Sequence, residues 1–198
     1  MDLQLLASVA VFAIATTGTP GPNNMMLTAS GANFGYWRTL PHLIGITLGV
    51  ATLIITVAAG LGILFQQFPL VQQLLKVVAS GYLLWLSWKI ATARSARFDS
   101  NSESRPMSLF AAAMFQFVNP KAWMMAITAV GSFTLSGGDY WHSVIWVAVM
   151  FMLCGFPCTS LWAAFGTLVG RLLSSPRAWR WFNGVMGALT AGCLFFIW

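Results

Sequence analysis

Hydrophobic residues fall in long, unbroken runs along this chain, and short polar stretches separate the runs. The run LIGITLGVATLIITVAAGLGILF is one example, and each run reaches the roughly 20 residues that a helix needs to cross the hydrocarbon layer of a membrane. Because a spanning segment must satisfy its own backbone hydrogen bonds, runs of this kind predict helices. We predict six transmembrane helices, near residues 3–35, 40–65, 69–91, 107–135, 141–169 and 179–198.

The composition agrees with an all-α membrane protein. Of the 198 residues, 58% are hydrophobic and only 7% are charged, whereas soluble domains are about one-quarter charged. Charged residues are therefore too few to cover a water-facing surface, which excludes a soluble α/β domain.

One strongly polar stretch, ATARSARFDSNSESRP, lies at the middle of the chain and separates three predicted helices from three. This position suggests a duplication, and an odd number of helices in each half forces the second copy to enter the membrane in the opposite sense. We predict a first three-helix repeat over residues 1–98, a cytoplasmic linker over 99–106 and a second, inverted three-helix repeat over 107–198.

Lysine and arginine are distributed unevenly between the two ends of the predicted helices. If successive helices alternate in direction, Lys76 flanks one membrane face and most of the ten Lys and Arg residues flank the other. Cytoplasmic loops are enriched in these residues, so we predict that both termini lie outside the cytoplasm. The net charge of +6 then reflects topology, and we predict no nucleic-acid partner. The residues on the predicted cytoplasmic face are Arg38, Lys89, Arg94, Arg97, Arg105, Arg171, Arg177 and Arg180.

Proline interrupts the first and fourth predicted helices near their midpoints, in the segments TPGPNN and VNPK. Proline lacks an N–H, and its ring clashes with the carbonyl four residues earlier, so helical pairing fails at these places. Non-helical backbone deep in a membrane is tolerated only where it is buried in protein or lines a wet cavity. We therefore predict that the two breaks face one another inside the bundle; the alternative is that the prolines only kink the helices. Pro20 frees the carbonyl of Thr16, Pro22 frees that of Gly18, and Pro120 frees that of Gln116.

The breaks supply groups for both ends of a zwitterion. Each break starts a new half-helix whose unpaired N–H groups favour an anion, and around Asn23 and Asn24 this predicts a carboxylate site. The freed carbonyls and the amide oxygens of these residues and of Asn119 can accept hydrogen bonds from an ammonium group. The predicted substrate-binding residues are Thr16, Gly18, Pro20, Gly21, Pro22, Asn23, Asn24, Gln116, Asn119, Pro120 and Lys121.

Lys121 is the charged residue that lies well inside a predicted helix, and an intramembrane charge indicates a functional site by default. It can pair with a substrate carboxylate. It is also the candidate coupling group, because a buried lysine can release its proton when the empty site closes and regain it when a carboxylate arrives. The alternative is that Lys121 extends its side chain to the membrane interface.

The predicted helices contain no aspartate or glutamate at depth, so neutral substrates fit better than cationic ones. For the same reason we predict no metal site, and we predict no cofactor and no catalytic residue. His42 and His142 lie near helix ends and are expected at the interfaces. Cys154 and Cys158 support an alternative, a membrane-embedded thiol-redox protein, although small buried cysteines commonly only fill space. A passive pore is a third alternative.

Thr19-Pro20-Gly21-Pro22-Asn23, Gly81-Tyr82-Leu83 with Trp85 to Lys89, and Asn119-Pro120-Lys121 together resemble the LysE/RhtB family of amino-acid exporters. TPGPNN, YLLWLSWKIATA and FQFVNPK are most similar to its cysteine and O-acetylserine exporters, although many relatives carry aspartate where this chain has Asn23. The resemblance implies a secondary transporter that exports amino acids across the bacterial inner membrane by antiport with protons or by the membrane potential. The expected partners are an amino-acid substrate, a coupling proton and membrane lipid, and a homo-oligomer is compatible with the sequence.

Overall fold

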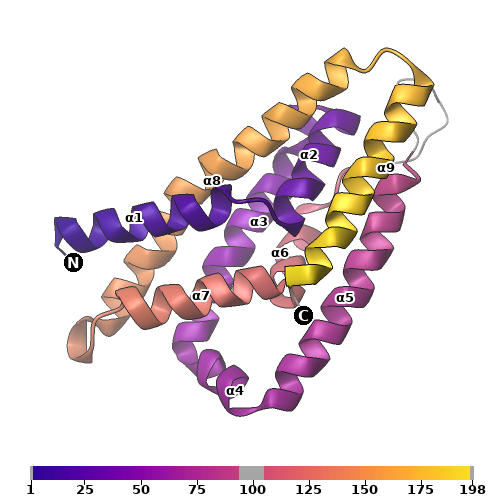
Figure 1. Cartoon of the computed structure of the whole chain (residues 1–198). Coiled ribbons are helices and arrows are strands. Elements are labelled where there is room, and N and C mark those ends of the chain that lie inside the picture. The colour runs from indigo at the N-terminus through magenta and orange to yellow at the C-terminus, as the bar shows by residue number, and fades with distance from the viewer. Residues whose placement is uncertain (1, 94–104, 197–198) are drawn as a thin grey trace.

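The computed structural model (Figure 1) describes residues 2–93 and 105–196, apart from the side chains of Leu64, Phe65 and Phe196. Within these ranges the chain is helical with short connections and contains no β-strand. Most of the predicted linker 99–106 lies outside the described residues, as do Arg94 and Arg97.

The first predicted helix is broken, as expected. Helix α1 (Leu3–Gly18) begins after Asp2, whose carboxylate accepts a hydrogen bond from the backbone N–H of Leu5 at 2.8 Å. It ends where Thr19 turns to an extended conformation, and helix α2 (Pro22–Phe34) then starts with proline in its first turn. The two helices are bent by 61° relative to each other. Proline at the start of α2 sacrifices no helical hydrogen bond, so the sequence ends one helix and begins the next within three residues.

The next two helices complete the first half of the chain. Helix α3 (Tyr36–Thr56) starts earlier than predicted and continues through a π-helical turn (Val57–Leu61) into the short helix α4 (Gly62–Gln67). Gly60 makes this bend because its φ of 109° is accessible mainly to glycine. Helix α5 (Pro69–Ala91) has the predicted bounds.

The second half repeats the pattern of a broken helix followed by long ones. Helix α6 (Leu109–Val118) and helix α7 (Pro120–Phe133) meet at Asn119, so the second predicted break is also present. A 3-10 turn leads into helix α8 (Tyr140–Leu172), which is longer than predicted and is not ended by its internal proline. Helix α9 (Pro176–Gly192) is followed by a 3-10 turn over Cys193–Phe196.

Several helices are long and apolar enough to cross a membrane. Among the described residues these are Tyr36–Leu61, Pro69–Ala91 and Gly137–Leu172, and α1 with α2 qualifies as one bent span. Large apolar side chains on the long helices are exposed, such as Leu74 on α5 and Leu161 on α8, as expected of a lipid-facing surface. The six-span inverted layout also requires α6 with α7 and α9 as spans, and it stays a prediction.

Glycines bring the long helices close to the broken ones. A side chain at Gly166 on α8 would collide with the backbone of α2 at Thr28, and one at Gly45 on α3 would collide with the backbone of α6 at Leu109. Small residues of this kind allow helix backbones to approach in membranes. Helices α8 and α3 therefore each pack tightly against a broken helix of the other half of the chain.

Helices α1 and α7 lie side by side in opposite directions (Figure 1). The rings of Phe12 on α1 and Phe133 on α7 are 5.4 Å apart at one end of this pair, and Lys121 reaches Thr19 at the other. The antiparallel pairing brings the two breaks together although they are a hundred residues apart in sequence.

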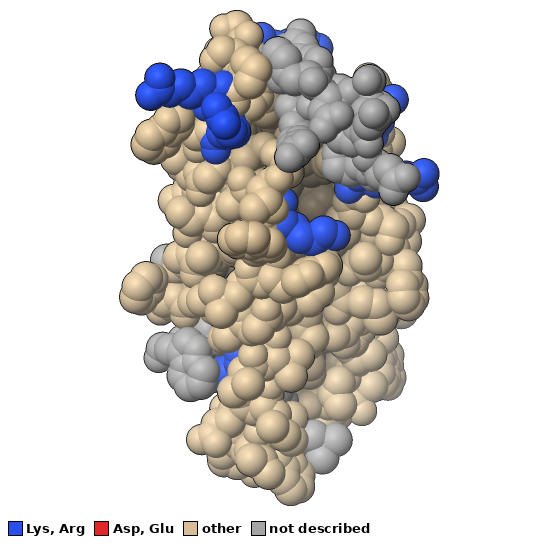
Figure 2. All heavy atoms as spheres, turned by 90° about the vertical axis from the view of Figure 1, so that its right-hand side faces the viewer, with Lys and Arg blue, Asp and Glu red and all other residues tan. Residues whose placement is uncertain are grey.

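Lysine and arginine gather at one end of the molecule on the face that Figure 2 shows. In Figure 1 the same end carries the last turns of α5 and α8 and the first turn of α9. These turns contain Lys89, Arg171 and Arg177. The uneven charge predicted from the sequence is therefore present in the fold, whereas the membrane side that this end faces stays a prediction.

Candidate functional site

Lys121, in the first turn of α7, bridges the two breaks. Its ammonium Nζ donates to the carbonyl of Thr19 at 2.9 Å, to the hydroxyl of Thr19 at 2.8 Å and to the carbonyl of Pro20 at 3.2 Å. A positive charge at the carboxyl end of a helix also interacts favourably with the helix dipole. The lysine of the second break is therefore held by the backbone of the first.

A second bridge joins Asn23 at the start of α2 to Gln116 near the end of α6. The two side-chain amides pair reciprocally, with Asn23 Nδ2 donating to Gln116 Oε1 at 2.9 Å and Gln116 Nε2 donating to Asn23 Oδ1 at 3.1 Å. Gln116 is fully buried and also donates to the carbonyl of Ala112 at 2.9 Å. Buried amides of this kind are stable only when they are paired, so this contact fixes α2 against α6.

The carbonyls of the first break are satisfied by protein groups. Asn24 Nδ2 donates to the carbonyls of Thr17 and Thr19, both at 2.8 Å. The indole N–H of Trp162 on α8 donates to the carbonyl of Gly18 at 3.1 Å. The carbonyl of Gly18, a predicted acceptor for a substrate ammonium, is thus occupied by Trp162, which was not among the predicted binding residues.

The other freed carbonyls also have partners. The carbonyl of Thr16 accepts from the hydroxyl of Thr19 at 2.9 Å, and that of Gln116 accepts from the backbone N–H of Asn119 at 3.3 Å. The first break is not wholly buried, because Thr19 and Pro20 are exposed at the surface of the bundle. The prediction that the breaks face one another is confirmed by these contacts, while their enclosure is incomplete.

The amino ends of the two half-helices differ. Asn119 Oδ1 caps the start of α7 by accepting from the backbone N–H of Lys121 at 3.2 Å. The start of α2 has no side-chain cap, since the capping position is Gly21. A Cβ placed on Gly21 would lie 3.1 Å from Lys121 Nζ, so the ammonium lies directly against this uncapped helix end. Two positive features therefore converge at Gly21, which suits a carboxylate.

The space between the breaks is small. The cavity has a volume of about 30 Å³, which is close to the room that one water molecule needs. An amino acid does not fit there in this conformation. Of the predicted residues, Gly18, Pro20, Pro22, Gln116 and Pro120 lie next to this cavity without lining it. Its lining residues are Thr16, Thr17, Gly21, Asn23, Asn24, Ile46, Val50, Asn119, Lys121, Ala122, Met125 and Thr159.

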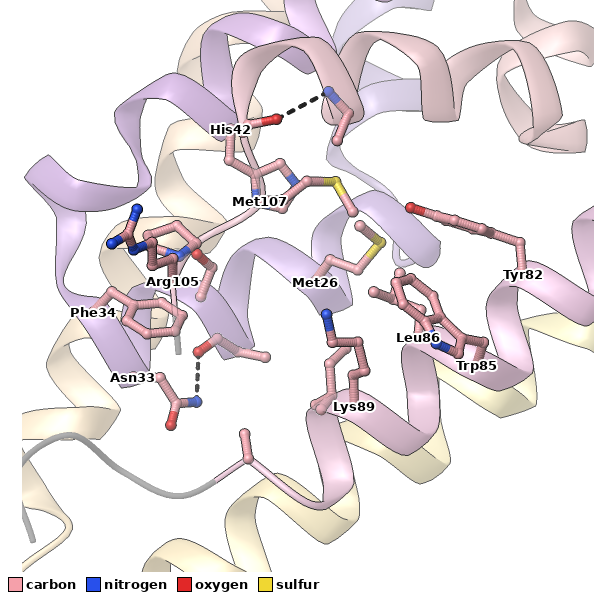
Figure 3. A pocket seen from close by; sticks show the side chains of 17 residues that line it. Met26, Asn33, Phe34, His42, Tyr82, Trp85, Leu86, Lys89, Arg105 and Met107 are labelled. Carbon is pink, nitrogen blue, oxygen red and sulfur yellow. Dashed lines mark hydrogen bonds between the residues drawn. The ribbon is translucent and has the colours of Figure 1, made fainter. Parts of the chain in front are cut away.

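A much larger cavity of about 620 Å³ lies between α2, α3, α5 and the start of α6 (Figure 3). None of the predicted site residues lines it, but His42, Lys89 and Arg105 do. The expectation that His42 lies at an interface is corrected by its burial inside the bundle, where 1% of its surface is exposed. The sequence signal for this position is a histidine in the first turns of an apolar helix.

The alternative chemistry has less support. Cys154 and Cys158 are free thiols on α8, and neither lines either cavity. In the described parts of the chain, no three His, Cys, Asp or Glu side chains come close enough to hold a metal ion.

Comparisons with known proteins agree with the resemblance seen in the motifs. The family model described as LysE type translocator matches residues 14–196. The Cysteine/O-acetylserine efflux protein of Salmonella typhimurium (strain LT2) is 32% identical over 174 residues, which cover 86% of this chain and 87% of that protein. The protein of the same name from Escherichia coli (strain K12) is 29% identical over 194 residues, covering 98% of this chain and 97% of that protein. No solved structure matches. The chain belongs to the LysE type translocator family, and it is therefore a transporter rather than an enzyme.

Proposed function

We propose that this protein exports small neutral amino acids, of the cysteine or O-acetylserine type, across the bacterial inner membrane. Amino-acid efflux is the function in the names of the relatives, and the finer statement about substrate rests on the site. The observation that carries the proposal is the bridge from Lys121 Nζ to the carbonyls of Thr19 and Pro20, because it couples the two breaks through groups that a zwitterion can replace.

The substrate would use groups that are already oriented toward one another. Its carboxylate fits between the ammonium of Lys121 and the uncapped amino end of α2 at Gly21. Its ammonium fits the carbonyls of Thr17 and Thr19, in place of the side chain of Asn24. No acidic residue lines the cavity, so nothing there pairs with a second positive charge. This arrangement favours neutral over cationic amino acids.

The transport cycle that we infer is alternating access. In the present conformation the two breaks are joined by protein–protein hydrogen bonds, and the space between them is too small for a substrate. A substrate that enters must replace contacts of Lys121 and Asn24, and this replacement loosens one half of the chain from the other. The two halves would then rock about the site and expose it to the opposite side of the membrane.

Packing between the halves supports an inverted repeat. Helix α3 of the first half contributes Ile46 and Val50 to the cavity beside the second break. Helix α8 of the second half crosses the first break, where Trp162 binds Gly18 and where Gly155 approaches Thr17. Each half therefore supplies the long helix that covers the break of the other, as expected if both halves derive from one ancestor.

Lys121 is the proposed coupling group for protons. Its ammonium has three oxygen acceptors and no acidic partner in the present conformation. These acceptors all belong to the first break, so they are withdrawn when the breaks separate. The lysine can then release its proton unless a carboxylate takes their place. Proton uptake with substrate and proton release from the empty carrier would couple the movement of protons to that of the amino acid.

We propose that the cationic end faces the cytoplasm and that both termini are periplasmic. Ser136 and Ser174 are exposed and lie beyond the two ends of α8, which makes them a matched pair for labelling. In a chain whose native cysteines are replaced by serine, cysteine at position 136 should react with an impermeant thiol reagent in intact cells. Cysteine at position 174 should react only after the inner membrane is permeabilised. The reverse result would overturn the orientation.

The function is tested with purified protein in proteoliposomes under imposed pH and voltage gradients. We expect saturable movement of radiolabelled cysteine or O-acetylserine, and little movement of arginine. Selective transport of arginine would contradict the proposed substrate class. Conductance that does not saturate with substrate would contradict a carrier and favour a passive pore.

A further inference from the structure

The larger cavity has a shape and position that the break site does not explain. Its volume of about 620 Å³, against about 30 Å³ between the breaks, lies in the range of small-molecule sites. Met26, Ala29, Ser30 and Asn33 line it from one face of α2, at the three- and four-residue spacing of a helix. Because Asn23 at the start of the same helix lies at the break, α2 connects the two cavities.

The charge of the cavity is one-sided. Lys89 and Arg105 line it, and its lining includes no aspartate or glutamate among the described residues. The ammonium of Lys89 points into the cavity in Figure 3 and lies 4.6 Å from the centre of the Trp85 ring. A cavity whose described lining carries cations and no acidic group attracts a carboxylate and repels a molecule with an additional positive charge.

His42 is the unexplained polar group of this cavity. It is 1% exposed, and neither of its ring nitrogens has a hydrogen-bond partner among the described residues. Buried polar atoms are almost always paired, so an orphaned imidazole in the wall of a cavity indicates a missing partner. A neutral imidazole has one donor and one acceptor nitrogen. It can therefore accept from a substrate ammonium, and the hydroxyl of Tyr82, which also points into the cavity, can do the same (Figure 3).

We propose that this cavity is an intake site that binds the amino acid before it reaches the breaks, and that it selects zwitterions with uncharged side chains. Lys89 holds the carboxylate, His42 accepts from the ammonium, and the substrate side chain lies against Met26 and Trp85. The imidazole nitrogens are shielded in the present conformation, so binding requires a neighbouring side chain to shift. Methionines such as Met107 in the lining can do this because they are flexible. The inference rests on the proposed export of neutral amino acids and places their selection at a site separate from the breaks.

The first test variant is Lys89→Met, with Arg171→Met as its matched control. Arg171 is an exposed cation at the same end of the molecule, and it lines neither cavity. In proteoliposomes the lysine variant should raise the KM for O-acetylserine roughly tenfold, since it removes the charged hydrogen-bond donor to the carboxylate. The maximal rate should stay close to that of the wild type, and arginine should compete better than before. Arg171→Met should change neither the KM for O-acetylserine nor the competition by arginine.

The second variant is His42→Phe, which separates a binding role from a structural one. Because His42 makes no hydrogen bond within the protein, the variant should unfold at the wild-type temperature or higher. Its KM for O-acetylserine should nevertheless rise several-fold. The intake site would be overturned if both Lys89→Met and His42→Phe keep the wild-type KM for O-acetylserine and the wild-type preference against arginine.

Equilibrium binding in detergent distinguishes this failure from failure of the proposed function. A wild-type protein that moves no neutral amino acid would contradict the proposed export. The intake site would still be supported if radiolabelled O-acetylserine binds the detergent-solubilised protein and Lys89→Met weakens that binding. It would be overturned together with the function if no binding occurs. The other possible occupant is a lipid, which native mass spectrometry detects. If phosphatidylglycerol binds the wild type and is lost in Lys89→Met, while amino-acid binding is unchanged, the cavity belongs to lipid and the proposal is contradicted.

Discussion

The two cavities of this transporter differ in how their polar groups are satisfied. Between the breaks, Lys121, Asn23 and Asn24 all bind protein atoms, and the remaining space holds about 30 Å³. In the cavity of about 620 Å³, within the described parts of the chain, the imidazole of His42 has no hydrogen-bond partner and Lys89 has no acidic neighbour in the lining. A satisfied site can bind substrate only by exchanging its own contacts, whereas an unsatisfied one gains contacts without losing any. The structure thus combines a closed break site with a larger cavity on the cationic side.

Removing the charge that joins the breaks should have the largest effect. Lys121→Met deletes the donor to Thr19 and Pro20 and the proposed partner of the carboxylate. Hydrogen bonds to charged groups contribute about 1.5–3 kcal/mol, so the export rate in proteoliposomes should fall roughly tenfold to a hundredfold. Lys121→Arg keeps the charge and should retain part of the rate with a changed pH dependence.

Folding of Lys121→Met is checked by gel filtration and by its unfolding temperature, with Arg171→Met as the variant that removes an exposed charge. Wild-type export by Lys121→Met across the pH range would show that this lysine neither binds substrate nor couples protons. The break site would then lose its central role in the comparison.

Restoring helical backbone at a break should have the next largest effect. A proline inside a helix is about 3 kcal/mol less favourable than alanine, so Pro22→Ala favours a continuous helix through the first break. The carbonyls that Asn24 and Lys121 now bind would pair within that helix instead. We expect export to fall roughly tenfold while expression changes less.

Pro157→Ala is the matched control for the breaks, because Pro157 lies within α8 without ending it. It should export at nearly the wild-type rate. If Pro20→Ala, Pro22→Ala and Pro120→Ala all export normally as well, substrate binds away from the breaks and the larger cavity becomes the main site.

A smaller effect is expected from the amide pair that closes the breaks. Asn23→Ala leaves the buried amide of Gln116 without its partner and should lower the free energy of unfolding by about 1–3 kcal/mol. The double variant Asn23→Ala with Gln116→Leu should be more stable than the sum of the single effects, because no buried amide is left unpaired. Unfolding in detergent measures each value. Additive effects would show that the pair does not hold the halves together.

The smallest effect is expected at the cysteines, which lie outside both cavities. Replacing Cys154 and Cys158 by serine should leave export within about twofold of the wild-type rate, since neither thiol contacts the proposed path. Export assays under oxidising and reducing conditions provide the measurement. A loss of most of the activity would reopen a thiol-based role for α8.

Part of the site could be predicted because it follows from local chemistry. A proline abolishes helical pairing with a carbonyl only four residues away, so Pro22 and Pro120 place the breaks without knowledge of the fold. The bounds of α5 likewise follow from an apolar run between a proline and a polar stretch. The bend at Gly60 was missed, because a glycine in an apolar run carries no signal that its φ is positive.

The partners in the site could not be predicted in the same way. Lys121 was expected to attract the substrate carboxylate together with the start of the half-helix near Asn23, and its contact with Thr19, 102 residues away in the sequence, was not predicted. His42 was expected at the membrane interface, yet the packing of α2, α5 and α6 around α3 buries it in a cavity wall. Such contacts depend on how helices cross, and sequence periodicity does not determine that.

The sequence by itself determined that the chain is helical and membrane-embedded, where the first and fourth helices break, and that positive charge gathers at one end. Only the tertiary structure decided which groups satisfy the broken backbone and which polar groups stay unsatisfied. The physical reason is the range of the forces involved. Backbone pairing acts within one helical turn, whereas the bonds from Lys121, from Asn23 to Gln116 and from Trp162 join residues that only helix packing brings together.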